Sequence, residues 1–133
     1  MDAVIRDFVR DRAGHRCEYC QMRQAAIPMV PFHIEHIIPQ QHGGNDHVDN
    51  LAFSCHRCNS FKGTNLAGFD PLTGAMVPLF HPRLQRWEDN FEMQNGWLIV
   101  GKTPIGRTTV RVLVMNEDRR VQVRQSRLPS QDE

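Results

Sequence analysis

The segment FHIEHIIP places two histidines and a glutamate within four positions, as His33, Glu35 and His36. A neutral imidazole can take a proton from water near neutral pH, and a carboxylate is a ligand for hard divalent cations. The apolar neighbours are typical of a buried strand, where polar groups are costly unless they have partners. These three side chains are therefore either paired or functional.

All four cysteines occur in two C-x-x-C pairs, Cys17 with Cys20 and Cys55 with Cys58. Each pair predicts a tight turn whose sulfurs point the same way, and two such turns supply the four ligands of a tetrahedral zinc ion. The alternatives are disulfides in an exported protein, for which a signal peptide is missing, and unrelated buried thiols, which do not explain the spacing. We expect a structural Zn²⁺, with His56 as a weaker competing ligand.

The surrounding elements must hold these residues in place. We expect a strand over about 30–37, a loop rich in glycine and asparagine over 41–50, a second strand over 51–55, and a helix that ends at Gly63, a residue suited to a C-cap. A zinc ion between the two cysteine pairs would hold the histidine strand against this helix. An N-terminal helix is predicted over 2–12, with an apolar face formed by Val4, Ile5, Phe8 and Val9.

Three pieces of this segment, HIEHIIP, GG followed by DNL, and CxxCNxxKG, together resemble the HNH endonuclease family, whose core is the ββα-metal motif. The resemblance covers residues 17–63, and the combination is specific although each piece alone is weak. It implies an α+β fold with a zinc-stapled, treble-clef-like ββα core. We expect one domain over residues 1–133, with the N-terminal helix in 1–16 and a C-terminal hairpin and helix extension, 64–133, packed on the core.

The resemblance implies catalytic roles for three residues. His36 matches the general base that deprotonates water, and Asn50 matches the central asparagine that fixes the loop and orients the histidine. Lys62 matches a basic residue near the phosphate. The alternatives are ordinary: His36 is a satisfied core histidine, Asn50 is a turn residue, and Lys62 is a solvated charge at the helix end.

The resemblance also implies a second metal. Glu35 and Asn59 match the ligands of a catalytic Mg²⁺ or Mn²⁺ ion, and His33 is a further candidate ligand or phosphate contact. Such a cation neutralises charge on the attacked phosphate and the departing oxygen. Adjacent strand residues point to opposite faces, so Glu35 and His36 converge only if the strand bends there, and the resemblance implies that bend. The family more often has aspartate at the position of Glu35.

The extension carries weaker signals. The patterns predict an edge strand over 75–80, a helix over 82–91 and a hairpin at NGW. A helix is expected over 103–116, where Thr103 and Pro104 open the segment, and its β-branched content leaves a strand as the alternative. A basic segment over 117–128 precedes a frayed end, 129–133. Leu84, Trp87 and Phe91 should share one helix face, and Trp97 should join the core. Six arginines either follow a DNA backbone or are solvated helix charges: Arg107, Arg111, Arg119, Arg120, Arg124 and Arg127.

The composition, 40% apolar and 23% charged, is that of an ordinary globular domain. No apolar run approaches the roughly 18 residues of a membrane span, and the charged N-terminus lacks a signal-peptide core. We therefore expect a cytoplasmic protein without membrane partners. The formal net charge of +1 is weak for a nucleic-acid binder, so contacts with DNA would have to come from local patches.

These features together predict a metal-dependent HNH endonuclease that hydrolyses DNA phosphodiester bonds with low sequence specificity. The alternative is a non-catalytic zinc module that binds DNA or protein, which explains the cysteines equally well. A third interpretation keeps the fold and makes RNA the substrate.

Overall fold

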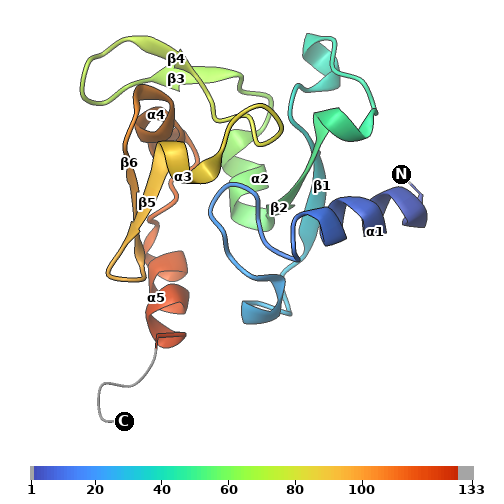
Figure 1. The fold of residues 1–133 in the computed structure, drawn as a ribbon, viewed down its shortest axis with the longest axis horizontal. Helices are drawn as coiled ribbons and strands as arrows, with labels where there is room; N and C mark the ends of the chain where they lie inside the picture. Colours follow the sequence, from blue (N-terminus) through green and yellow to red (C-terminus); the bar gives the residue numbers. More distant parts are fainter. Residues whose placement is uncertain (1, 129–133) are drawn as a thin grey trace.

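Helix α1 (Ala3–Arg12) precedes the first cysteine turn, and the chain then forms an antiparallel hairpin of β1 (Phe32–His36) and β2 (Leu51–Cys55) that leads directly into α2 (His56–Lys62). This arrangement is that of a computed structural model, which describes residues 2–128 (Figure 1). The expected order of strand, loop, strand and helix is confirmed. The predicted frayed end, 129–133, lies outside the described residues.

The hairpin is regular along its whole length, from Phe32 opposite Cys55 to His36 opposite Leu51. Every residue of β2 is buried, because α1 covers one face of the hairpin and the zinc turns with α2 cover the other. β1 begins two residues later than expected. The preceding residue, Pro31, has no N–H to donate to a strand ladder.

Helix α1 begins at the N-cap Asp2, whose carboxylate accepts a hydrogen bond from the Ile5 N–H at 2.9 Å. Val9 is fully buried against the hairpin residues Leu51 and Phe53. Arg12 at the helix C-terminus donates to the Leu51 carbonyl at 2.7 Å, so the C-terminal end of α1 is tied to the hairpin. The expected apolar face was too wide, because Val4 and Phe8 are exposed.

The described part of the extension, residues 64–128, contains two further hairpins and three helices: β3 (Ala67–Phe69) with β4 (Met76–Pro78), β5 (Phe91–Gln94) with β6 (Leu98–Gly101), α3 (Trp87–Asn90), α4 (Pro104–Val112) and α5 (Asp118–Ser126). The hairpin at NGW is confirmed. Asn95 and Gly96 both have positive φ, 56° and 79°, as the tight turn of a twisted hairpin requires. Strand β3 was not predicted from the sequence.

Helix α4 is confirmed, although it ends at Val112 rather than at residue 116. The Thr103 hydroxyl caps its N-terminus by accepting from the Gly106 N–H at 3.0 Å, and Pro104 occupies the first turn. The rest of the predicted segment turns away because Asn116 bonds the backbone of Ile99, accepting from its N–H at 2.9 Å and donating to its carbonyl at 2.8 Å.

The helix predicted over 82–91 is wrong, since only α3 is helical there and Leu84 is 78% exposed. Arg83 instead inserts its side chain towards Glu18 and forms an ion pair with it. Trp87 and Phe91 do lie together, with stacked rings whose centroids are 5.1 Å apart, but Phe91 already belongs to β5. The partners of Arg83 and Phe91 are distant in sequence, so local periodicity could not reveal them.

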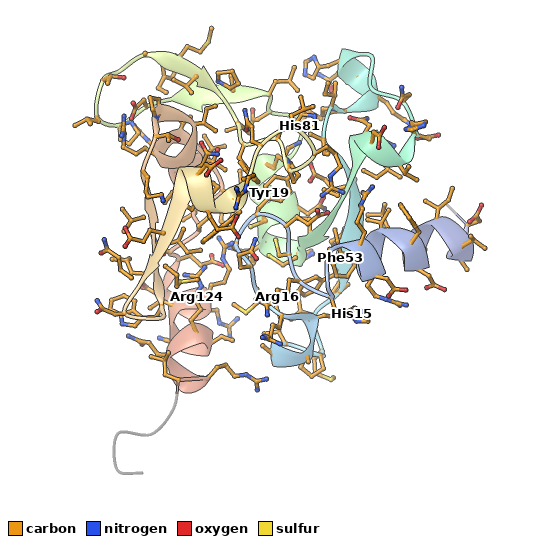
Figure 2. All side chains as sticks on the ribbon, viewed as in Figure 1. His15, Arg16, Tyr19, Phe53, His81 and Arg124 are labelled. Atoms are coloured by element: carbon orange, nitrogen blue, oxygen red, sulfur yellow. The ribbon has the colours of Figure 1, made fainter. Side chains whose placement is uncertain are left out.

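The largest buried cluster draws on both halves of the chain. Tyr19 from the first zinc turn is fully buried near the centre of the molecule (Figure 2), and its ring meets the edge of Phe80 at 6.5 Å between centroids. Phe91, Leu113 and Met115 of the extension belong to the same cluster. Trp87 packs at its margin and donates its indole N–H to the Tyr19 carbonyl at 2.7 Å. The extension is therefore continuous with the packing around the zinc turns.

Candidate metal centre and catalytic strand

The four cysteine sulfurs gather at the N-terminal end of α2, and all lie within 4.8 Å of one another. The Sγ atoms of Cys20 and Cys55 are 3.6 Å apart, close to the ~3.8 Å expected between sulfurs bound tetrahedrally at 2.3 Å from zinc. In each turn the second cysteine N–H donates to the first sulfur: Cys20 to Cys17 and Cys58 to Cys55, both at 3.4 Å. The donor set fits one structural Zn²⁺.

His56 does not belong to this cluster. Its Nδ1 lies 3.1 Å from Nε2 of His33, and the two rings are 5.3 Å apart with a tilt of 37°. The four-thiolate interpretation is therefore the better one. Within residues 2–128, the cysteines are also the one place where three or more His, Cys, Asp or Glu side chains converge as a metal site.

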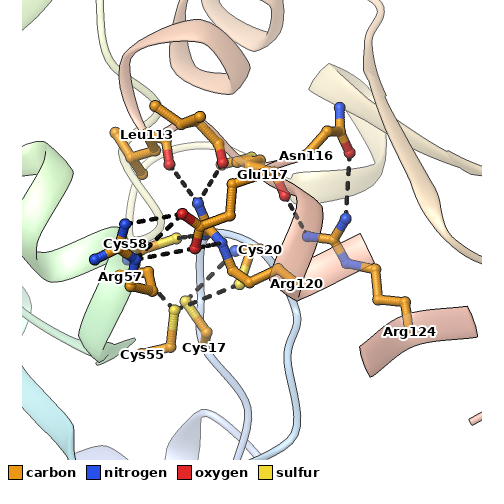
Figure 3. Close-up of polar contacts among 12 residues, drawn as sticks. Cys17, Cys20, Cys55, Arg57, Cys58, Leu113, Asn116, Glu117, Arg120 and Arg124 are labelled. Atoms are coloured by element: carbon orange, nitrogen blue, oxygen red, sulfur yellow. Dashed lines mark hydrogen bonds and ion pairs between the residues drawn. The ribbon is translucent and has the colours of Figure 1, made fainter. Parts of the chain in front are cut away.

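Arg120 of α5 lies on the zinc cluster (Figure 3). Its side chain is 5% exposed; Nη1 lies 3.1 Å from the Cys58 sulfur, Nη2 donates to the Leu113 carbonyl at 2.7 Å, and Nε donates to Glu117 at 3.1 Å. Burial lowers the pKa of Arg120, but the cysteine charges and Glu117 outweigh this and raise it above its usual value. The guanidinium therefore stays charged beside the thiolates.

Arg124 is internal as well. It donates to the side-chain oxygen of Asn116 at 3.2 Å (Figure 3). It also donates to the Trp97 carbonyl at 3.0 Å and to the Met115 carbonyl. The two predicted interpretations, DNA contact and solvated charge, are therefore wrong for Arg120 and Arg124. A four-thiolate zinc has a net charge of −2 and favours a nearby cation, but spacing in the sequence could not say which arginine supplies it. Arg111, Arg119 and Arg127 are exposed.

Asn50 closes the loop that separates the two strands of the hairpin. Its Oδ1 accepts from the Ile38 N–H at 2.9 Å, and its Nδ2 donates to the carbonyls of Ile38 at 2.9 Å and Asn45 at 2.8 Å. Gly44 lies so close beneath this clamp that a Cβ there would be 1.6 Å from the Ile38 carbonyl oxygen. This arrangement agrees with the loop-fixing role that the HNH resemblance implies for Asn50.

His36, at the end of β1, faces the same loop. Its side chain is 25% exposed, and its Nε2 lies 2.7 Å from Oδ1 of Asp46. The hydrogen bonds from His36 and then Gln40 lower the pKa of Asp46. Asp46 was not among the residues predicted for the site. The signal for it in the sequence is an acidic residue in the loop between His36 and Asn50.

Glu35 points to the opposite side, towards α2. Its side chain is 6% exposed, and Oε1 lies 2.6 Å from the ammonium of Lys62, which also donates to the Ile37 carbonyl at 2.9 Å. Burial raises the pKa of Glu35, although Lys62 opposes this shift. The buried hydroxyl of Tyr19 lies next to this carboxylate, and its interaction with Glu35 also opposes the rise in the pKa of Glu35. The interpretation of Lys62 as a solvated charge is therefore wrong.

The structure does not bring all the predicted residues together. The bend expected at Glu35 and His36 is absent, because the strand ladder runs unbroken through His36 and continues with the Ile37 N–H donating to the Asn50 carbonyl at 2.8 Å. Asn59 lies on α2, half-buried and one turn before Lys62.

The sequence comparisons agree with this geometry. Residues 17–65 match the family model described as HNH endonuclease, which confirms the family inferred from the motifs and the α+β fold with its cysteine-stapled ββα core. Residues 17–65 therefore match an HNH endonuclease domain.

Among curated proteins, the chain is similar to the Septu protein PtuB of Bacillus thuringiensis, with 31% identity over 109 residues. The match covers 80% of this chain and 39% of that protein, so the chain spans about two fifths of the length of this relative. No solved structure matches the chain. Among residues 2–128, no helix has the length and apolar character to cross a membrane.

Proposed function

We propose that this protein is a metal-dependent endonuclease that hydrolyses DNA phosphodiester bonds with weak sequence preference. The observation that carries the proposal is the position of His36: a partly exposed imidazole at the end of a strand that zinc turns support, beside a loop clamped by Asn50. A neutral imidazole in such a place can take a proton from an attacking water. Asn50 contributes by keeping the loop in register with β1.

The proposed catalytic cation is Mg²⁺ or Mn²⁺, held by Glu35 and Asn59, with His33 as an additional candidate ligand. Because Glu35 lies on the α2 side of β1 and His36 on the loop side, this assignment requires β1 to bend at these two residues when the cation and the phosphate bind. The carboxylate of Glu35 and the side-chain amide of Asn59 support this assignment, because oxygen atoms of these two groups are ligands that hard divalent cations prefer. The bound cation would neutralise charge on the phosphate and the departing oxygen. Lys62 acts as a positioning residue: it pairs with Glu35 and holds the carbonyl end of β1 against α2.

The second candidate function is a non-catalytic zinc module that binds DNA or protein. The ion pair between Glu35 and Lys62 favours it, since this carboxylate already has a cationic partner. Cleavage of RNA by the same residues is a third candidate. In each case we propose a cytoplasmic location, because a four-thiolate zinc site suits a reducing compartment.

The test is cleavage of supercoiled plasmid and of single-stranded RNA by the zinc-loaded protein, with Mg²⁺, Mn²⁺ or neither. His36→Ala should lose about a hundred- to ten-thousandfold in rate, the usual contribution of a general base, while it keeps its zinc. Asn59→Ala should recover part of its activity as the divalent cation is raised, and His36→Ala should not. His47→Ala, in the exposed part of the same loop, is the matched control.

One result would reject the enzyme, and a second would reject only its proposed base. The first is a wild-type protein that cuts neither nucleic acid with any divalent cation; DNA retention on a filter would then favour the zinc module. The second is an His36→Ala variant that cuts at the wild-type rate, which would remove His36 as the base. Cleavage of RNA but not of plasmid would change the substrate and keep the mechanism.

A further inference from the structure

We propose that Asp46 is a positioning residue for His36: its carboxylate holds the imidazole as the Nε2–H tautomer, so that Nδ1 is the atom that accepts the proton from water. The catalytic half of this statement rests on the function proposed above. The tautomer half rests on the structure alone, and the experiment below separates the two.

The contact is direct and short. Oδ1 of Asp46 lies 2.7 Å from Nε2 of His36, and the same oxygen accepts from Nε2 of Gln40 at 3.3 Å. Hydrogen bonds of this length to an ionised group are among the stronger ones. Both partners of Asp46 come from the segment at the end of β1, so the carboxylate bridges the end of the strand to the loop.

The backbone on both sides of Asp46 is fixed. The carbonyl of Asn45 accepts from Nδ2 of Asn50 at 2.8 Å, and the side chain of Asn45 accepts from the His47 N–H at 3.0 Å. Gly44 is confined beneath the Ile38 carbonyl. Asp46 is therefore an exposed side chain on a restrained backbone, which is the arrangement expected of a residue that orients another group.

The protonation state of Asp46 decides the tautomer of His36. Asp46 is an exposed aspartate that accepts from His36 and Gln40, so its carboxylate is ionised near neutral pH and can only accept. Nε2 must then carry a hydrogen, and in the neutral ring Nδ1 keeps the lone pair. When one ring nitrogen donates to a carboxylate, the other is fixed as the acceptor.

This assignment defines the proton's path. A water molecule gives one proton to Nδ1 of His36, and its oxygen forms the new bond to phosphorus. The bond from phosphorus to the departing sugar oxygen breaks, and that oxygen takes a proton from solvent. The imidazolium returns its Nδ1 proton to water. Throughout, Asp46 keeps its negative charge and stabilises the cationic ring, as the aspartate of a serine protease triad does.

Stability alone does not explain the pair. The side chain of Asp46 is 69% exposed, and exposed ion pairs contribute little to folding. The two roles therefore predict different results. Loss of a positioning residue changes the tautomer of His36 and kcat but not the melting temperature, whereas loss of a structural contact lowers the melting temperature.

The experiment uses the zinc-loaded 133-residue chain labelled with ¹⁵N-histidine, and compares wild type with Asp46→Asn and Asp46→Ala. Long-range ¹H–¹⁵N correlation spectra at mildly alkaline pH report the tautomer of each histidine, and His36→Gln identifies the signals of His36. Asp49→Asn is the matched control, because Asp49 lies in the same loop with a 79% exposed side chain that contacts His47 instead. Plasmid cleavage supplies kcat and KM for each protein.

We expect Nε2–H for His36 in wild type and in the control, and a shift of the population towards Nδ1–H in both Asp46 variants. Their kcat should fall about ten- to a hundredfold with KM unchanged, less than the ~10⁴-fold for the buried aspartate of a triad. An Nδ1–H tautomer in wild type, or an Asp46→Asn variant with the wild-type tautomer and kcat, overturns the proposal. A wild-type protein with the expected tautomer but no cleavage overturns the nuclease function and leaves the Asp46 contact established.

Discussion

The guanidinium of Arg120 lies 3.1 Å from the sulfur of Cys58, although the two residues are 62 positions apart in the chain. One belongs to the last helix of the described chain and the other to the second zinc turn. Because four thiolates and a Zn²⁺ carry a net charge of −2, the extension supplies part of the countercharge that the metal centre needs. The extension and the zinc centre are therefore coupled electrostatically as well as by packing.

Arg120→Met should destabilise the protein by about 3–5 kcal/mol, the usual cost when one partner of a buried charge pair is removed. It leaves Glu117 and the thiolates without this cation and the Leu113 carbonyl without its donor. Urea unfolding followed by circular dichroism measures the change. Arg119→Met, the exposed neighbour on the same helix, should stay within about 0.5 kcal/mol of wild type. Equal effects of the two substitutions would contradict the coupling.

The purified protein should contain about one zinc ion per chain, as expected for a four-thiolate structural site. Cys55→Ser should lose the metal and the cooperative unfolding transition, because the binding free energy of a structural zinc is also folding free energy. Elemental analysis and thermal unfolding with and without a chelator make the measurement. A folded protein with four reactive thiols and no bound zinc would refute the predicted zinc site.

Lys62→Met should be strongly destabilising, by about 3–5 kcal/mol, because it leaves the buried carboxylate of Glu35 unpaired. The double variant Glu35→Gln with Lys62→Met removes both charges and should recover much of this loss. A double-mutant cycle of unfolding free energies provides the coupling energy. Additive effects of the two substitutions would show that the pair does not interact.

Gly44→Ala should displace the loop over 41–50, because the added Cβ would lie 1.6 Å from the Ile38 carbonyl oxygen. At the neighbouring Gly43 the space is open but φ is +88°, so Gly43→Ala should cost about 1–2 kcal/mol without moving the loop. Backbone amide shifts of residues 38–50 distinguish the two variants. Undisturbed shifts in Gly44→Ala would contradict the close packing.

Cleavage should show weak sequence preference. The arginines that remain on the surface of α4 and α5 suit phosphate contacts, which position a nuclease on DNA without specifying a sequence. A long linear DNA digested at moderate salt should therefore give a smear. Discrete and reproducible bands would count against this prediction.

The metal centre and the ββα core could be read from the sequence because their signals are local. The two C-x-x-C pairs, the alternation around Glu35 and the glycine after α2 each act within a few residues. The burial of charged side chains could not be predicted from such local patterns. Arginine and lysine side chains usually lie on the surface. Only the partners that folding brings to Arg83, Arg120 and Lys62 explain why these three side chains are largely buried.

The distance in sequence between Cys58 and Arg120 also orders events during synthesis. A ribosome delivers the fourth thiolate 62 residues before the arginine that covers it, several seconds earlier at about 5–20 residues per second. In that interval the four thiolates can bind zinc, but the Arg120 guanidinium and the other residues of the extension do not yet cover the site. Zinc can therefore bind while the chain is still being synthesised, before α5 has formed and covered the site.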